Sequence, residues 1–190
     1  QAKAFCACVS PALTYPMIHI VGVTPEARTL ADAFGGKVPH DVERVRIGKK
    51  EIAALFDGIH QTERTDVDAV MVGCPLLILD ELAELAAMLE GRTVKTRLWL
   101  FTDYVQYSAA RKAGIIERIE SSGARVVHSH CPGMVARAPE EAENMVVATD
   151  SLKVAMLFAG IGWPRNWLGT REDAIRAAVN GRFERTRWLS

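Results

Sequence analysis

The stretch Asp68-Ala-Val-Met-Val-Gly-Cys-Pro75 decides the fold that this sequence predicts. Its apolar, β-branched residues indicate a buried strand that ends at Gly73. Leucine and isoleucine recur at helical spacing from Ile78 to Glu90, which predicts an amphipathic helix directly after the strand. Cys74 is therefore expected at the carboxyl end of a strand, where open α/β sheets bind their ligands.

A second Cys-Pro pair, Cys131-Pro132, follows another short apolar strand, which is predicted over residues 124–127. Proline restrains the backbone of the preceding cysteine towards extended geometry, which helps to hold a thiolate pointing out of the sheet. We expect the two thiols to converge on one site. Thiolates held in this way suit iron–sulfur ligation, whereas the Cys-x-x-Cys spacing of zinc ribbons and thioredoxin-like motifs is absent from the sequence.

Strand and helix patterns alternate along the chain. Further strands are predicted over residues 17–21, 42–47, 97–101 and 145–148, and further helices over 25–34, 49–60, 104–113, 115–122, 152–159 and 170–179. This order predicts an α/β fold in three layers, with a mostly parallel sheet and helices on both faces. The length of 190 residues and the hydrophobic content of 49% favour a single domain over residues 1–190.

The charge and the termini limit the classes of function. Lys plus Arg and Asp plus Glu number 23 each, so no long-range field attracts nucleic acid or an anionic membrane. The sequence has neither a signal peptide pattern nor an apolar run near the roughly 20 residues of a membrane span, so we expect a cytoplasmic protein. The chain begins without a methionine, which suggests a fragment of a longer gene product.

The four cysteines are too few for a secreted disulfide framework. Cys6 and Cys8 alternate through an apolar stretch, which is typical of a strand with small side chains packed on one face. We assign no function to these two. Residues 132–144 lack clear periodicity and are expected to form a loop with an acidic helical turn around Glu140-Glu141.

Polar residues follow several of the predicted strands. Thr149-Asp-Ser-Leu-Lys153 places hydroxyls and backbone N–H groups at a helix start, with a cation one turn inside. Such a start binds carboxylate or phosphate, although an ordinary N-cap with an exposed lysine is the alternative. Thr24 and Thr102 occupy equivalent strand ends, so their side chains are expected at the same crevice as Cys74.

Histidines accompany these positions. His19 lies within an apolar strand pattern, where a core histidine bonded to the backbone is a common arrangement, but it also lies just before the turn that carries Thr24. His128 and His130 flank Ser129 immediately before Cys131. The sequence leaves two interpretations of this pair open, a role in tuning a metal and a solvated loop.

Four ordered segments together resemble the catalytic, large-subunit part of the aconitase X family. They are His19-Ile-Val-Gly-Val-Thr-Pro-Glu-Ala27, Val72-Gly-Cys-Pro75, Cys131-Pro132 and Thr149-Asp-Ser-Leu-Lys153. The resemblance spans most of the chain and implies an aconitase-like domain, corresponding to the carboxyl-terminal part of a longer catalytic unit. The family's Thr-Asn-Ser-Ala-Lys pattern has Asp150 and Leu152 at its second and fourth positions here, and the family's His after Cys-Pro is Leu76.

The resemblance implies a hydro-lyase that dehydrates a small hydroxy acid such as cis-3-hydroxy-L-proline. It also implies an iron–sulfur cluster, of the 2Fe–2S or 4Fe–4S type, with Cys74 and Cys131 as two of its ligands. Lys153 and Ser151 would be catalytic, and substrate would be bound by His19, Thr24, Thr102, Thr149, Ser151 and Lys153. A further cluster cysteine and a small swivel domain or subunit would come from outside this chain, which is expected to be inactive without them.

Three other interpretations remain open. One is the large subunit of a phosphomevalonate dehydratase, whose substrate differs from that of the proline-derivative enzymes. Another is a non-catalytic descendant that keeps the fold as an assembly or anion-binding module, which the apolar residues after Cys74-Pro75 favour. The third is a cysteine-nucleophile enzyme that uses Cys74 with a histidine base, but the sequence offers no evident partner to orient that base.

Overall fold

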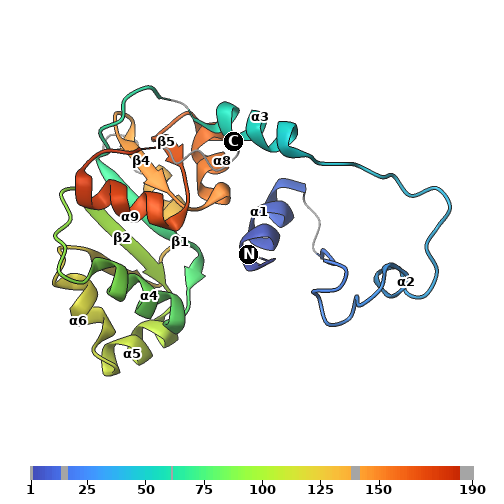
Figure 1. Ribbon diagram of the computed structural model, residues 1–190, viewed down its shortest axis with the longest axis horizontal. Coiled ribbons are helices and arrows are strands. Elements are labelled where there is room, and N and C mark those ends of the chain that lie inside the picture. The colour runs from blue at the N-terminus through green and yellow to red at the C-terminus, as the bar shows by residue number, and fades with distance from the viewer. Residues whose placement is uncertain (1, 14–16, 61, 138–141, 185–190) are drawn as a thin grey trace. The chain divides into compact units, whose positions relative to one another are not determined.

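The structure is a computed structural model that describes residues 2–13, 17–60, 62–137 and 142–184. The chain divides into two compact units, Gln1–Ile52 and Ala53–Ser190 (Figure 1). All the strands assigned to the described residues lie in the second unit. The α/β architecture therefore belongs to that unit, and its extension over residues 1–190 as one domain stays a prediction.

The second unit is built on a five-stranded parallel sheet with the order β3-β2-β1-β4-β5. The strands are β1 (Ala69–Leu77), β2 (Arg97–Thr102), β3 (Arg125–His128), β4 (Val146–Thr149) and β5 (Arg165–Leu168). This result confirms the predicted fold class. The strands predicted over residues 97–101, 124–127 and 145–148 are confirmed to within one residue at each end.

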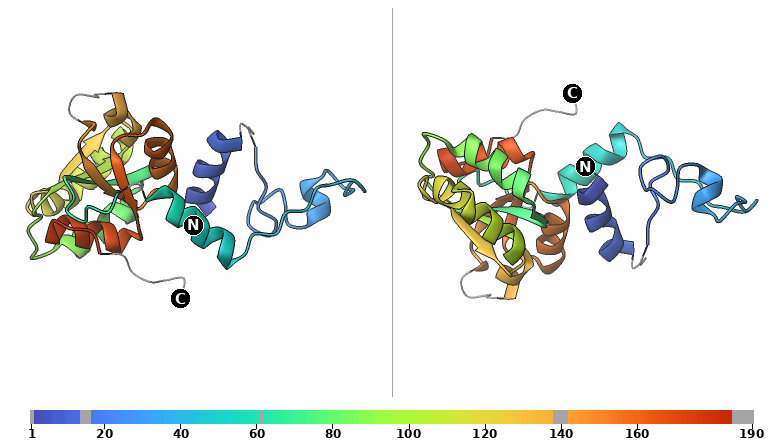
Figure 2. Two further views of the ribbon diagram at one scale, coloured as in Figure 1. Left: turned by 90° about the horizontal axis from the view of Figure 1, so that it is seen from above. Right: turned by 90° about the horizontal axis from the view of Figure 1, so that it is seen from below.

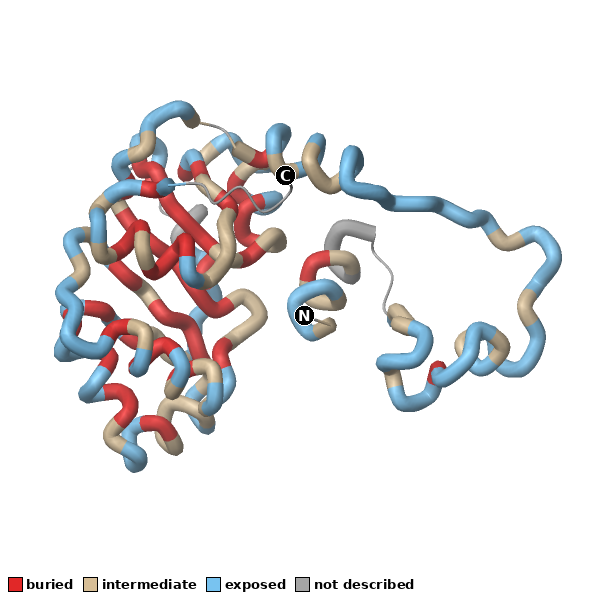
Figure 3. The backbone as a smooth tube through the Cα atoms, viewed as in Figure 1, coloured by how far each residue is buried: buried red, intermediate tan, exposed pale blue. Residues whose placement is uncertain are grey.

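Helices cover both faces of the sheet, as the two views in Figure 2 show. They are α4 (Leu79–Leu89), α5 (Tyr104–Lys112), α6 (Ile115–Glu120), α8 (Leu152–Ile161) and α9 (Arg171–Asn180). On one face, Val70 and Val72 belong to a core that includes α4, α6 and α9 residues. On the other face, Ala69 and Met71 pack in a core with Phe158 of α8. Alternate residues of a central strand are thus buried on opposite sides, which explains the continuous apolar run and the buried strands in Figure 3.

The strand order places a topological switch point between β1 and β4. From β1 the chain proceeds outward through β2 to β3, and it then returns to add β4 and β5 on the other side of β1. The connections after β1 and after β4 therefore diverge, and they leave a crevice at the carboxyl ends of the two strands. Cys74 follows the paired part of β1 on one side of this crevice, and the Thr149–Lys153 turn follows β4 on the other.

The carboxyl-terminal part of β1 contains a bulge at Gly73. Val72 pairs with Leu100 and Leu77 with Thr102, so four residues of β1 lie opposite the single residue Phe101 of β2. Gly73 has a φ of +114°, and a Cβ there would meet the Phe101 backbone, with the nitrogen at 2.9 Å. Only glycine fits this close approach, and the irregularity keeps Cys74 out of the regular ladder.

The first unit contains α1 (Ala2–Leu13), α2 (Leu30–Ala33) and the start of α3 (Lys49–Ile59), which continues into the second unit. The strand predicted around Cys6 and Cys8 is wrong, because this alanine-containing segment forms α1. Residues 17–21 and 42–47 are described and form no strand, so these two predictions are also wrong. The helix predicted from Pro25 begins only at Leu30, where Thr29 and Asp32 form a capping box.

Among the described residues, no helix has the length and apolar content needed to cross a membrane. The segment predicted as a loop after Cys131 begins with a 3₁₀ helix, η1 (Pro132–Arg137). The acidic turn predicted around Glu140-Glu141 lies outside the described residues.

Candidate functional site

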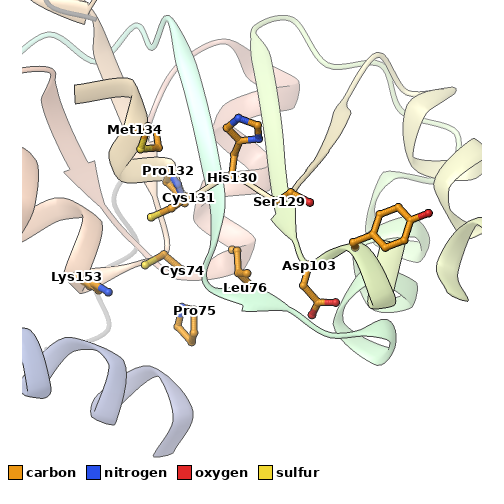
Figure 4. A pocket seen from close by; sticks show the side chains of 12 residues that line it. Cys74, Pro75, Leu76, Asp103, Ser129, His130, Cys131, Pro132, Met134 and Lys153 are labelled. Carbon is orange, nitrogen blue, oxygen red and sulfur yellow. The ribbon is translucent and has the colours of Figure 1, made fainter. Parts of the chain in front are cut away.

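A pocket of about 780 Å³ lies at the carboxyl ends of β1, β2 and β3 in the second unit. Its wall brings together residues from four separate segments (Figure 4). They are Gly73, Cys74, Pro75 and Leu76; Asp103 and Tyr104; Ser129, His130, Cys131, Pro132 and Met134; and Lys153. The predicted convergence of Cys74 and Cys131 on one pocket is therefore present in the structure.

Cys74 is half-buried at the bulge of β1, and its peptide bond to Pro75 is cis. Burial raises the pKa of the Cys74 thiol, and a hydrogen bond with Ser151 and the positive charge of Lys153 oppose that rise. The charges of Cys131 and Asp150 raise the pKa further. Cys74 thus lies within electrostatic reach of the second cysteine and of the β4–α8 turn (Figure 4).

Cys131 is exposed and precedes η1, in which the Met134 N–H donates to the Cys131 carbonyl oxygen at 2.9 Å. The residue two positions earlier, Ser129, has a φ of 64°, which is unusual for a residue other than glycine. The Ser129 N–H donates to the Thr102 carbonyl oxygen at 3.3 Å, next to the end of the β2–β3 ladder. This turn directs the chain from β3 across the pocket to Cys131.

The Thr149–Lys153 segment forms the start of α8, as predicted. Ser151 is the N-cap, and its hydroxyl oxygen accepts from the Val154 N–H at 3.3 Å. The Thr149 hydroxyl oxygen accepts from the Ser151 N–H at 3.1 Å. Lys153 is half-buried in the first helical turn and lines the pocket, so the alternative of a fully exposed lysine does not describe it.

Three of the predicted substrate-binding residues, Thr102, Thr149 and Ser151, are buried next to the pocket without lining it. Thr102 is 0% exposed, and its hydroxyl donates to the Leu77 carbonyl oxygen at 2.6 Å, which ties the end of β2 to the end of β1. Thr149 is likewise 0% exposed and shapes the turn through Ser151. Their roles in substrate binding, and that of Ser151 in catalysis, stay predictions, and in this structure their hydroxyls stabilise strand ends and the start of α8.

His19 and Thr24 belong to the first unit, whereas the described lining of the pocket comes from the second unit. The Thr24 hydroxyl donates to the Ile20 carbonyl oxygen at 3.0 Å and accepts from the Ile20 N–H at the same distance. This local turn fixes the Thr24 side chain within its own unit. The contribution of His19 and Thr24 to substrate binding stays a prediction.

The histidines around Ser129 occupy different environments. His130 lines the pocket, and its Nδ1 lies 3.2 Å from the His128 carbonyl oxygen. His128 instead packs against Tyr107, with ring centroids 4.5 Å apart, and against Tyr104 at 5.7 Å. Of the two histidines that alternate in the sequence, only His130 therefore lines the pocket with Cys131.

Sequence reasoning did not assign Tyr104 and Met134 to the site. Tyr104 is the first residue of α5 after Asp103, whose carboxylate caps that helix by accepting from the Val105 and Gln106 N–H groups. The position of Tyr104, two residues after the end of β2, was the signal that could have identified it. Met134 lies in η1, for which the sequence shows no helical period.

The side chains that line the pocket could bind a metal and an anion. Two thiols and one ammonium group line a partly apolar wall, which suits a soft metal centre beside an anionic ligand. Within the described residues, no group of three or more His, Cys, Asp and Glu side chains is placed to hold a metal ion. The pocket of this chain thus offers two sulfur ligands rather than a complete metal site.

Comparison with protein families gives two matches along the chain. Residues 67–180, more than half of the sequence, match the family described as aconitase X third domain. Residues 1–57 match the aconitase X second domain. The first match covers the parallel sheet and the pocket, and the second covers all of the first unit and the next few residues.

Curated relatives include a cis-3-hydroxy-L-proline dehydratase from Hypocrea jecorina, which is 30% identical over 96% of this chain. A cis-3-hydroxy-L-proline dehydratase from Pseudomonas aeruginosa is 30% identical over 95% of the chain. A phosphomevalonate dehydratase large subunit from Methanothermobacter thermautotrophicus is 29% identical over 84%. The chain spans only 31%, 31% and 38% of these relatives' lengths.

A solved structure also matches. The crystal structure of Thermococcus kodakaraensis aconitase X in its holo-form aligns with 83% of this chain and 38% of its own length. The TM-score is 0.66 at 24% sequence identity, which shows a shared fold.

Proposed function

Because the chain belongs to the aconitase X family, we propose that it forms part of the catalytic unit of a hydro-lyase. The proposed reaction is dehydration of a small hydroxy acid such as cis-3-hydroxy-L-proline. The observation that carries the proposal is the meeting of Cys74, Cys131 and Lys153 in one pocket at the switch point of a parallel sheet. Parallel α/β folds place their chemistry at this edge.

The cofactor implied by the family resemblance is an iron–sulfur cluster, and the donor set of the pocket fits a part of it. Cys74 and Cys131 would provide two thiolate ligands. A two-iron or four-iron cluster with cysteine ligands requires more donors than these two, so the others would come from the rest of the enzyme. When bound, the cluster would supply a Lewis acid for departure of the hydroxyl group.

The proposed reaction breaks one C–H and one C–O bond, forms a C=C bond and releases water. In this proposal the Lys153 ammonium faces the substrate carboxylate and stabilises negative charge that develops on the neighbouring carbon. Ser151 holds the Cys74 sulfur by a hydrogen bond and caps the helix that carries Lys153. The apolar surface of Leu76 and Met134 would exclude water and so strengthen these interactions.

A second candidate is the large subunit of a phosphomevalonate dehydratase, since relatives with this name match 84% of the chain at 29% identity. In that case a small subunit would complete the enzyme, as the name of the relative implies. A third candidate is a non-catalytic descendant, which the apolar Leu76 in the pocket wall favours. The first two candidates predict an assembly of this chain with further polypeptide.

The experiment is to assemble this chain with the missing family segments, load iron and sulfide anaerobically, and assay water loss from each hydroxy acid. We expect turnover of cis-3-hydroxy-L-proline by wild type and its loss in the Lys153→Met variant. Turnover of phosphomevalonate alone would favour the second candidate. Absence of both reactions in a fully loaded assembly would favour the non-catalytic descendant.

A further inference from the structure

A charged cluster joins the two connections that flank the switch point. The Arg171 guanidinium donates from Nε to Asp150 Oδ2 at 3.0 Å and from Nη2 to Glu81 Oε1 at 3.1 Å. Asp150 lies in the turn after β4, and Glu81 lies in the first turn of the helix after β1. One side chain therefore bridges the segments that follow the two neighbouring strands.

All three side chains are substantially removed from solvent. The exposed fractions are 12% for Asp150, 23% for Glu81 and 27% for Arg171. Burial raises the pKa of the Asp150 carboxyl, and the charge and hydrogen bond of Arg171 oppose that rise. Ion pairs at this depth are screened much less than surface pairs, and removing one partner leaves an uncompensated charge.

The position of Arg171 in its own helix offers no reason for a basic residue. Arg171 is the first residue of α9, and Thr170 and Asp173 already cap this end. The amino-terminal end of a helix carries partial positive charge, so a cation there is disfavoured by the helix dipole. The contacts with Asp150 and Glu81 are therefore what favours arginine at this position.

Each carboxylate is linked to backbone next to the pocket. The second oxygen of Glu81 accepts from the Ile78 N–H at 3.0 Å, immediately after the β1 segment that carries Cys74. Asp150 lies between Thr149 and Ser151, which set the start of the helix that carries Lys153. A planar guanidinium with several donors in fixed geometry can hold two such oxygens at once.

We propose that Arg171 is a positioning residue that clamps the Cys74 side of the pocket to its Lys153 side through Glu81 and Asp150. The clamp also neutralises the Asp150 carboxylate beside the turn that would receive an anionic substrate. Its relevance to catalysis rests on the proposed function, whereas its mechanical effect can be measured on this chain alone. The substrate class that it favours is a carboxylate, because an unneutralised Asp150 would repel one.

The test on this chain is amide hydrogen exchange in the Arg171→Gln variant. We expect the exchange rates of the Ile78 and Ser151 amides to rise at least about 10-fold. Loss of a hydrogen bond to a charged group shifts a local opening equilibrium by about this factor or more. The matched control is Arg118→Gln, which removes an exposed ion pair with Glu90 at 3.2 Å. Equal exchange at Ile78 and Ser151 in the two variants would overturn the proposal.

A double variant separates the bridge made by Arg171 from simple neutralisation of Asp150. Asp150→Asn combined with Arg171→Gln removes the buried carboxylate together with its counterion. We expect exchange at Ser151 to stay at least about 10-fold faster than in wild type, because this variant lacks the bridge to Glu81 although it leaves no unpaired Asp150 charge. Exchange that returns to the wild-type rate would overturn the clamp, because Arg171 would then act only by neutralising Asp150. If Arg171→Gln does not fold, Arg171→Lys takes its place, and wild-type exchange in that variant overturns the proposal.

Activity of the assembled enzyme supplies the second readout. We expect Arg171→Gln, and likewise Asp150→Asn with Arg171→Gln, to lower kcat/KM for the hydroxy acid at least about 10-fold. Wild type that dehydrates no hydroxy acid but shows the expected exchange pattern would contradict the proposed function and leave the clamp supported. An active enzyme in which Arg171→Gln behaves like Arg118→Gln would contradict the clamp alone.

Discussion

Replacing Gly73 by alanine tests whether the bulge of β1 depends on a residue without a side chain. The added Cβ would collide with the Phe101 carbonyl oxygen and lie 2.9 Å from the Phe101 nitrogen. These atoms belong to the backbone of the neighbouring strand, so no side-chain rotation relieves the contact. The φ of +114° adds strain of its own for any residue with a side chain.

The magnitude follows from these two effects. An unfavourable φ costs about 1–3 kcal/mol, and displacement of β2 by the collision raises the total to about 4 kcal/mol or more. The matched control is Gly91→Ala, at a φ of +69° with nothing within 4 Å of the added Cβ. Only conformational strain applies there, so we expect a loss of about 1 kcal/mol.

Urea unfolding of the two variants, followed by far-ultraviolet circular dichroism, measures the difference in the free energy of unfolding. We expect Gly73→Ala to have the much lower midpoint at an unchanged denaturant slope. Equal losses of stability in the two variants would refute the reasoning, because the close approach of Gly73 to Phe101 would then impose no constraint on β1.

Two further changes test the site. Thr102→Val should lower the free energy of unfolding by about 1–3 kcal/mol, because it leaves the buried Leu77 carbonyl without its hydroxyl donor. A calorimetric stability equal to that of wild type would argue against this contact. Burial raises the pKa of Cys74, so near neutral pH its alkylation by iodoacetamide, followed by mass spectrometry, should be slower than that of the exposed Cys131. Lys153→Met should slow alkylation of Cys74 further, because it removes a charge that lowers this pKa, and an unchanged rate would contradict the assigned electrostatics.

Much of the sheet of the second unit could be predicted because its three central strands, β1, β2 and β4, are largely buried on both faces. Such strands appear in the sequence as continuous apolar runs, and Gly91 and Gly114 end the helical patterns between them. The strand β5 was missed because Arg165 and Asn166 are polar, so the segment has no continuous apolar run. Its place in the sheet comes from pairing with β4, which local periodicity does not reveal.

The first unit shows the opposite case. Val45 and Ile47 alternate with charged residues as in a strand, yet they are 74% and 72% exposed and have no ladder partner among the described residues. Alternation of apolar and charged residues indicates that a segment could form a half-buried strand. Without a neighbouring strand to pair with, such a segment does not form one. The helical conformation around Cys6 and Cys8 was misread because a single alternation of two small residues is too short to establish the strand period.

The site was predicted in part for a topological reason. Residues after parallel strands share one edge of the sheet, so Cys74, Cys131 and Lys153 could be grouped without coordinates. Which hydroxyls reach the pocket depends on the direction of each side chain at a bulge or turn, and Thr102 and Thr149 are buried. The Arg171 clamp joins residues 90 and 21 positions away in the sequence, and no local pattern marks such contacts.

The most direct test of the account is iron–sulfur reconstitution of the assembled enzyme with single cysteine variants. We predict charge-transfer absorption in wild type and its loss in both Cys74→Ala and Cys131→Ala, with Cys8→Ala as the matched control that keeps it. Full absorption and full iron content in both pocket variants would contradict the claim that these two sulfurs serve one metal centre.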